Sequence, residues 1–227
     1  MSIITIKGLA KVYDEKSVPV YALNGIDLAF EEGEFTAIVG PSGSGKTTLL
    51  NLLGGLDAAS SGTVDIAGTN MGALSPRNLT RFRLHNIGFV FQSYNLLPVL
   101  TAQENIEFVM QLQGRKKAER AARAQALLSA VGIPDRGASR PGQLSGGQQQ
   151  RVAVARALAS RPRFVLADEP TANLDSRAAE NLLDIMEKLN KEELVTFIFS
   201  THDVRVMHKA KRIITLEDGR VLKDETV

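Results

Sequence analysis

The sequence predicts an α/β fold: a phosphate-binding core that carries an antiparallel β subdomain and an inserted helical subdomain. Three observations predict it. A glycine-rich loop stands between an apolar strand and a helical run, the early strands follow one another across short turns, and the later strands alternate with helices. No convincing strand occurs between about residues 93 and 159. We expect one domain over residues 1–227, with the core and β subdomain in 1–92 and 160–227 and the helical subdomain in 93–159.

The predicted strands are short runs rich in β-branched and aromatic residues. They cover residues 3–6, 26–30, 35–39, 64–66, 87–91, 164–167, 196–199 and 213–216. Turn signals at Glu32-Gly33 and at Gly68 separate the early strands. This spacing favours antiparallel pairing in the first third of the chain and a parallel sheet in the remainder.

Helical periodicity indicates three segments. Residues 48–53 follow the glycine-rich loop, 118–131 place apolar residues on one face, and 176–190 do the same with charged residues opposite. Glycines and a proline make 137–142 the expected loop within the helical subdomain.

Composition excludes several classes of site. Lys and Arg number 27 against 25 Asp and Glu, so a net charge of +2 gives no electrostatic reason to expect nucleic acid. The absence of cysteine excludes disulfides, thiolate zinc sites and iron–sulfur ligation by this chain, and it suits a reducing cytosol. No apolar run approaches the ~18 residues that cross a bilayer, and the first residues lack the features of a signal peptide. We expect any membrane-spanning segment to belong to another polypeptide.

The glycine-rich loop matches the full phosphate-loop pattern. Its backbone N–H groups and the following helix N-terminus can cradle phosphates, Lys46 can reach the β- and γ-phosphates, and the Thr47 hydroxyl can ligate Mg²⁺. The alternative is a glycine-rich turn before a helix, which the flanking strand and helix disfavour. The candidate nucleotide-binding residues are Gly40, Pro41, Ser42, Gly43, Ser44, Gly45, Lys46, Thr47 and Thr48.

Two adjacent carboxylates, Asp168 and Glu169, follow the apolar strand 164–167. Parallel sheets bind ligands at the carboxyl ends of their strands. Asp168 would hold Mg²⁺ through water, and Glu169 would orient or deprotonate an attacking water molecule. The alternative is a pair of helix-capping carboxylates before Pro170.

A third motif is more specific. Leu144-Ser145-Gly146-Gly147-Gln148, followed by Gln149-Gln150-Arg151-Val152, resembles the signature sequence of ABC-type ATPases. Ser145, Gly146, Gly147 and Gln148 open a helix and form a second N–H-rich anion site. One chain cannot easily wrap both anion sites round one phosphate. The resemblance implies a head-to-tail homodimer in which each ATP lies between the phosphate loop of one subunit and the signature of the other.

The resemblance also implies roles for four separated residues. Tyr13 matches the aromatic residue that stacks on adenine, and Gln92 matches the glutamine that senses Mg²⁺ and the γ-phosphate. Asp175 matches the loop that crosses the dimer interface, and His202 matches the switch histidine beside the γ-phosphate. Each also has a plain alternative: strand packing for Tyr13, a strand-end polar residue for Gln92, a helix N-cap for Asp175, and a bond to a buried carbonyl for His202.

Within the family, the chain is most similar to the subgroup that contains the MacB and LolD ATPases. The similarity rests on Asn51 to Asp57, Phe89 to Leu97 and Ala167 to Thr171, and Ala172 departs from the glycine usual there. It implies an integral-membrane permease as partner, periplasmic adaptor proteins reached through it, and a place on the cytoplasmic face of the inner membrane. The exposed-looking residues Tyr94, Leu96, Leu97, Pro98 and Leu100 would seat the permease, or else pack within the helical subdomain.

Two rival interpretations remain. One is a soluble ABC ATPase that acts on a scaffold complex such as iron–sulfur cluster assembly. The other is a nucleic-acid-linked ABC ATPase, but such proteins carry long coiled coils, zinc modules or two nucleotide domains, none of which fits in 227 residues.

Overall fold

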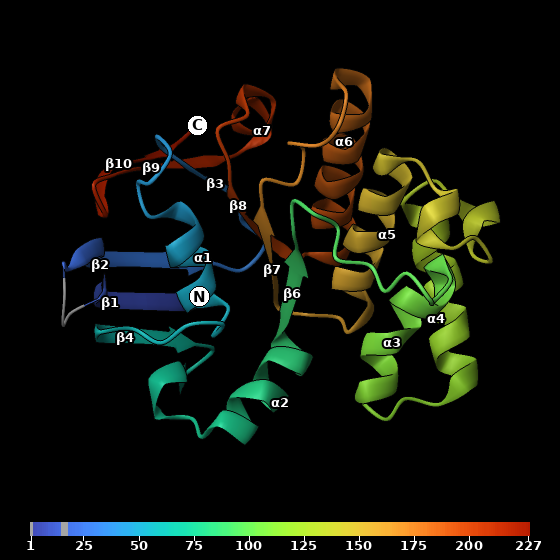
Figure 1. The fold of residues 1–227 in the computed structure, drawn as a ribbon, viewed down its shortest axis with the longest axis horizontal. Coiled ribbons are helices and arrows are strands. Elements are labelled where there is room, and N and C mark those ends of the chain that lie inside the picture. The colour runs from blue at the N-terminus through green and yellow to red at the C-terminus, as the bar shows by residue number, and fades with distance from the viewer. Residues whose placement is uncertain (1, 15–17) are drawn as a thin grey trace.

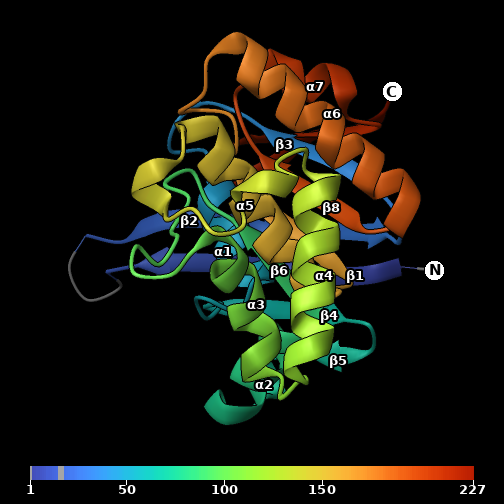
Figure 2. The same cartoon turned by 90° about the vertical axis from the view of Figure 1, so that its right-hand side faces the viewer.

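The computed structural model describes residues 2–14 and 18–227, and it has the predicted α/β fold with two β-sheets. Figure 1 shows the first, antiparallel sheet beside the larger sheet, with a helical part on the far side of the latter. Figure 2 turns that helical part, α3 and α4, toward the viewer.

The antiparallel sheet has the strand order β2-β1-β4-β5. Its strands are β1 (Ser2–Tyr13), β2 (Val20–Glu31), β4 (Ser61–Ile66) and β5 (Thr69–Asn70). The predicted runs 3–6 and 26–30 lie inside β1 and β2, which are 12 residues long each. Register shifts along the β1–β2 pair break the alternation of buried and exposed residues, so periodicity underestimated both strands.

The larger sheet has the order β10-β9-β3-β8-β7-β6. Its strands are β3 (Phe35–Val39), β6 (Ile87–Val90), β7 (Phe164–Asp168), β8 (Thr196–Ser200), β9 (Arg212–Glu217) and β10 (Arg220–Thr226). The pairs from β9 to β6 are parallel, whereas β10 pairs with β9 in antiparallel fashion. The largely exposed β10 lacks an apolar face and was not predicted.

The helices that accompany the sheets are α1 (Lys46–Leu53), α2 (Pro76–Asn86), α5 (Gly146–Ala159), α6 (Ser176–Glu193) and α7 (Val204–Lys209). Helices α3 (Ala102–Leu112) and α4 (Lys117–Ala130) stand beside α5 (Figure 2). Short 3₁₀ turns η1 (Met71–Ala73), η2 (Pro134–Arg136) and η3 (Pro141–Gln143) fall between elements, and η3 takes part of the loop expected at 137–142. In the part of the chain that the structure describes, no helix is long and apolar enough to cross a membrane.

The larger sheet separates two hydrophobic cores, and β3 contributes to both. Phe35, Ala37 and Val39 enter the core formed with α5 and α6, whereas Ile38 enters the core formed with α1 and the antiparallel sheet. A strand buried on both faces holds its ends rigidly. The phosphate loop that follows Val39 therefore starts from a fixed point.

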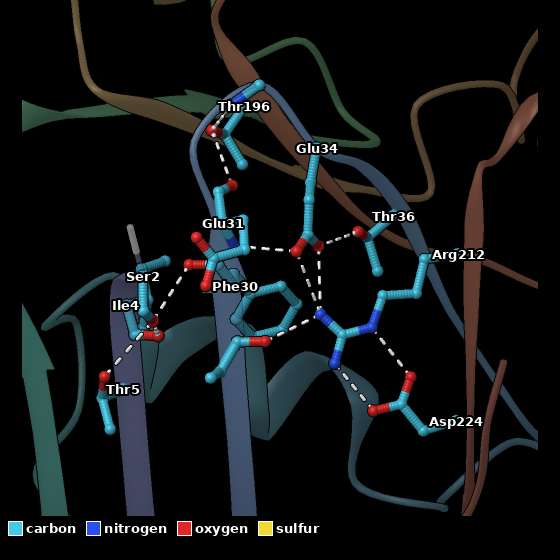
Figure 3. Close-up of polar contacts among 12 residues, drawn as sticks. Ser2, Ile4, Thr5, Phe30, Glu31, Glu34, Thr36, Thr196, Arg212 and Asp224 are labelled. Atoms are coloured by element: carbon cyan, nitrogen blue, oxygen red, sulfur yellow. Dashed lines mark hydrogen bonds and ion pairs between the residues drawn. The ribbon is translucent and has the colours of Figure 1, made fainter. Parts of the chain in front are cut away.

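Arg212 joins the two sheets at the opposite end of β3 (Figure 3). Its guanidinium donates to the carbonyl oxygen of Ala29 at 2.7 Å, to Oε2 of Glu34 at 3.1 Å and to both carboxylate oxygens of Asp224 at 2.8 and 2.7 Å. These bonds, led by the one to Asp224, raise the pKa of Arg212. The contact ties β2, the start of β3 and β10 into one unit.

Candidate nucleotide site

The phosphate loop makes close backbone approaches that only glycine permits. A Cβ atom on Gly40 would lie 2.1 Å from the carbonyl oxygen of Leu216, and one on Gly45 would lie 2.5 Å from that of Ala22. Both residues also have positive φ, at 148° and 102°. The sequence pattern of glycines thus reflects a loop that is pressed against β2 and β9.

Lys46 folds back over this loop. Its Nζ donates to the carbonyl oxygens of Gly40 at 2.8 Å and Pro41 at 2.9 Å, and the residue is only 9% exposed. The Oγ atom of Ser44 is buried and has no hydrogen-bond partner among the residues that the structure describes. A phosphate group fits this arrangement because its oxygens would accept from both side chains.

Two of the three residues predicted to hold magnesium, Thr47 and Asp168, meet at the carboxyl end of β7. Thr47 Oγ1 on α1 and Asp168 Oδ1 at the end of β7 are 3.2 Å apart. Among the described residues, no three His, Cys, Asp or Glu side chains gather into a metal-binding group. This sparse donor set suits Mg²⁺, which takes one or two protein ligands together with phosphate oxygens and water.

Glu169 directly follows Asp168 and has a left-handed backbone with φ 45°. Its Oε1 lies 2.6 Å from Nδ1 of His202, and its Oε2 accepts from the Thr201 hydroxyl at 3.1 Å. The His202 side chain is 76% exposed. Strained backbone is typical of functional positions, and this one aims the carboxylate at the end of β8.

Gln92 and Tyr13 are less closely joined to these groups. The carbonyl oxygen of Gln92 accepts from Asn173 Nδ2 at 2.9 Å, and within the described residues no hydrogen bond joins its side chain to Thr47 or Asp168. Tyr13 donates to Asp57 Oδ2 at 2.8 Å, and Lys11 Nζ lies 4.7 Å from the centre of its ring. Partial burial and the Asp57 carboxylate raise the pKa of Tyr13. Its stacking on adenine stays a prediction.

The signature residues form a separate site. Ser145 caps α5: its Oγ accepts from the N–H of Gln148 at 3.3 Å, and the Gln148 side chain accepts from the N–H of Ser145 at 3.0 Å. Gly146 and Gly147 line a cavity of about 390 Å³ together with Asp175, and no residue of the phosphate loop lines it. Asp175 caps α6 by accepting from Ala178 at 2.8 Å. The helix-capping alternative is therefore present at Asp175, and its role across an interface stays a prediction.

Two side chains of α5, the buried Gln150 and the half-buried Arg156, received no role of their own from the sequence. Gln150 donates to the carbonyl oxygen of Pro170 at 2.8 Å. Arg156 donates to the carbonyl oxygens of Tyr94 and Asn95, and burial lowers its pKa. An arginine within the otherwise apolar run 152–159 was the available signal, because buried charges require partners.

Comparisons with known proteins agree with this geometry. The family model described as "ABC transporter" matches residues 23–172. The chain is 48% identical over 98% of its length to "Macrolide export ATP-binding/permease protein MacB 2" of Aeromonas hydrophila, and spans 34% of that relative. It is 46% identical over 97% of its length to "Lipoprotein-releasing system ATP-binding protein LolD" of Anaeromyxobacter dehalogenans, and spans 93% of it.

A solved structure agrees as well. The post-hydrolysis dimer of the ATP-binding cassette MJ0796, bound to ADP and Pi, superimposes with a TM-score of 0.90 at 43% identity, covering 98% of each chain. A phosphate loop, an adjacent carboxylate pair and a signature helix thus lie on a shared fold. The chain belongs to the ABC transporter family, as one of its ATPases that bind ATP with Mg²⁺.

Proposed function

We propose that the chain is the ATP-hydrolysing subunit of a MacB/LolD-type transport system, acting as a homodimer on a membrane permease. Residues 1–92 and 160–227 would form the nucleotide-binding core and 93–159 the helical subdomain. The observation that supports this proposal is that the two anion sites, the phosphate loop and the signature, are separate. None of the residues that line the cavity at Gly146 and Gly147 belongs to the phosphate loop. Two subunits placed head to tail would bring one site of each onto the same ATP.

In this proposal each site residue has a chemical task. Lys46 would exchange its two carbonyl partners for β- and γ-phosphate oxygens, while Thr47, Asp168 and Gln92 would hold Mg²⁺, which neutralises the phosphate charge. Glu169 would orient and deprotonate the attacking water. His202 would turn from Glu169 to donate to the γ-phosphate, which its exposed side chain permits. Tyr13 would stack on adenine, and Asp175 would reach across the dimer interface.

ATP binding would close the dimer, and loss of the γ-phosphate would open it. The permease would receive this movement at a cavity of about 500 Å³ between α2, β6, α3 and α5. Apolar residues that line it include Leu84, Val109 and Leu112, the last of which is 59% exposed.

Only part of the apolar patch expected after Gln92 is exposed. Leu97 and Pro98 are exposed, and so is Val99, which was not predicted. Tyr94, Leu96 and Leu100 are half-buried instead. Leu96 packs against the core, and the Tyr94 hydroxyl lies over Gly146. Within this patch, only Leu97, Pro98 and Val99 are exposed enough to contact the permease beside the cavity.

The names of the relatives support macrolide export or lipoprotein release as the class of transport. The chain would act on the cytoplasmic face of the inner membrane, beside the permease. Periplasmic adaptor proteins would join through the permease. No observation favours the scaffold-bound iron–sulfur ATPase.

The test uses a stalled enzyme. Tagged Glu169→Gln protein, purified from its own cells in mild detergent with ATP and Mg²⁺, should bind ATP, remain dimeric and retain a stoichiometric permease. Recovery without any permease, or with a scaffold protein, would refute the transporter assignment. Hydrolysis at the wild-type rate would refute the role of Glu169.

A matched pair of variants locates the contact. Leu112→Glu places a charge in the apolar cavity and should abolish permease recovery, while ATP-dependent dimerisation persists. Leu222→Glu carries the same charge on β10, where the leucine is 66% exposed, and should leave recovery unchanged. Equal recovery with both variants would contradict this docking site.

A further inference from the structure

Three consecutive residues at the end of β8 contact Glu169. The carbonyl oxygen of Ser200 accepts from the Glu169 N–H at 2.8 Å. The Thr201 hydroxyl donates to Glu169 Oε2 at 3.1 Å, and His202 Nδ1 lies 2.6 Å from Oε1. Backbone and both carboxylate oxygens of Glu169 are thus held by one short segment.

The Thr201 hydroxyl has a fixed direction. Its Oγ1 accepts from the N–H of Asp203 at 3.0 Å, so its own proton is free for Glu169. Thr201 is fully buried, and its N–H donates to the carbonyl oxygen of Ile38 at 3.0 Å. The side chain therefore has neither room nor backbone freedom to turn away.

Asp203 is anchored in turn. Its Oδ2 accepts from the buried Thr171 hydroxyl at 2.6 Å and from Arg205 Nη2 at 2.7 Å, and its Oδ1 accepts from the N–H of Arg205 at 2.9 Å. Thr171 lies two residues after Glu169, so the chain of bonds returns to the segment that carries the carboxylate. The side chains that form this ring of hydrogen bonds are mostly shielded from water.

We propose that Thr201 is a positioning residue for Glu169: its buried hydroxyl, oriented by Asp203, holds Oε2 throughout the catalytic cycle. The inference rests on the role proposed for Glu169. Thr201 and His202 differ in their freedom to move. The exposed imidazole of His202 can leave Oε1 when a γ-phosphate arrives, whereas the buried Thr201 cannot leave Oε2. The Glu169 carboxylate would therefore keep its orientation when the contact with His202 is lost.

The test compares Thr201→Val with Thr201→Ser. Valine keeps the branched shape and removes the hydroxyl, so kcat for ATP hydrolysis should fall by roughly ten- to a hundredfold, with KM for ATP within about twofold. Serine keeps the hydroxyl and should restore kcat to within about threefold of wild type. Wild-type kcat in Thr201→Val, or an equal loss in both variants, would overturn the proposal.

A double-mutant cycle separates positioning from general damage. In a Glu169→Gln background, Thr201→Val should change the residual rate by less than about twofold, because a residue that acts through Glu169 has nothing left to position. The same fold loss in both backgrounds would overturn the proposal while leaving the role of Glu169 intact. Full activity of Glu169→Gln alone would instead refute that role, and this inference with it.

Discussion

Arg156 Nη2 donates a 2.8 Å hydrogen bond to the carbonyl oxygen of Tyr94, from the last turn of α5 to the segment that follows Gln92. The same guanidinium also binds the carbonyl oxygen of Asn95. Tyr94 and Asn95 both have left-handed backbones, with φ 56° and 50°. Such conformations persist only when their surroundings hold them, so Arg156 fixes the path of the chain between Gln92 and the exposed residues Leu97, Pro98 and Val99.

Arg156→Lys should therefore destabilise the protein. A single ammonium cannot reproduce the planar two-point contact, and a half-buried carbonyl loses its partner, at a cost of about 1 kcal/mol. The free energy of unfolding in urea measures this loss. Arg177→Lys, on the exposed surface of α6, is the control and should change the free energy of unfolding by less than about 0.5 kcal/mol.

Gly146→Ala should impair catalysis more than stability. An added Cβ would lie 2.8 Å from the Tyr94 hydroxyl, so the tyrosine must move while α5 gains a better helix-forming residue. We expect the ATPase rate to fall roughly tenfold or more, with the free energy of unfolding changed by less than about 1 kcal/mol. A Cβ on Gly142 would meet nothing within 4 Å, so wild-type rates in Gly142→Ala and losses confined to Gly146→Ala would support the contact.

Lys46→Ala should lose nucleotide affinity. The ammonium is the main positive charge over the phosphate loop, and charge-assisted bonds to phosphate are worth about 1.5–3 kcal/mol, or roughly ten- to a hundredfold in Kd. Titration with a fluorescent ATP analogue measures Kd. Lys188→Ala, with a side chain 64% exposed on α6, should bind as wild type does. An unchanged Kd for Lys46→Ala would contradict the phosphate assignment.

Asp203 should stabilise the fold in a pH-dependent way. Burial alone would raise the pKa of Asp203, but the hydrogen bonds from Arg205 and Thr171 outweigh it and lower the pKa to about 2. The contribution is then fully present above the unfolded pKa of about 3.9 and is lost as pH falls through about 2. Wild type should exceed Asp203→Asn in unfolding free energy by about 1 kcal/mol near neutral pH, after solvent screening. A difference that stays constant between pH 5 and pH 2 would contradict this pKa.

The sequence predicted the strands that carry dense apolar runs and missed α2, α3 and β10, although α3 buries Ala102, Ile106 and Met110. β3, β7 and β8 are buried on both faces, so their apolar runs stand out. β10 and α2 were missed because neither has a single fully buried residue. At the site, the phosphate loop and the carboxylates follow from local spacing. Thr201, Asp203 and Thr171 do not, because their contacts bring together strand ends that only tertiary packing aligns.

The pairing of β3 has a consequence for how the protein is made. The turn before β3 binds Thr196 at the start of β8 through the N–H of Gly33, across 163 positions of sequence. At a ribosomal speed of about 5–20 residues per second, the five buried residues of β3 wait on the order of ten seconds or more for the strands that flank them. Until β8 and β9 are synthesised, the residues of β3 form an apolar segment that chaperones can bind. A nascent chain stalled before β8 should bind no nucleotide, although its phosphate loop is already complete.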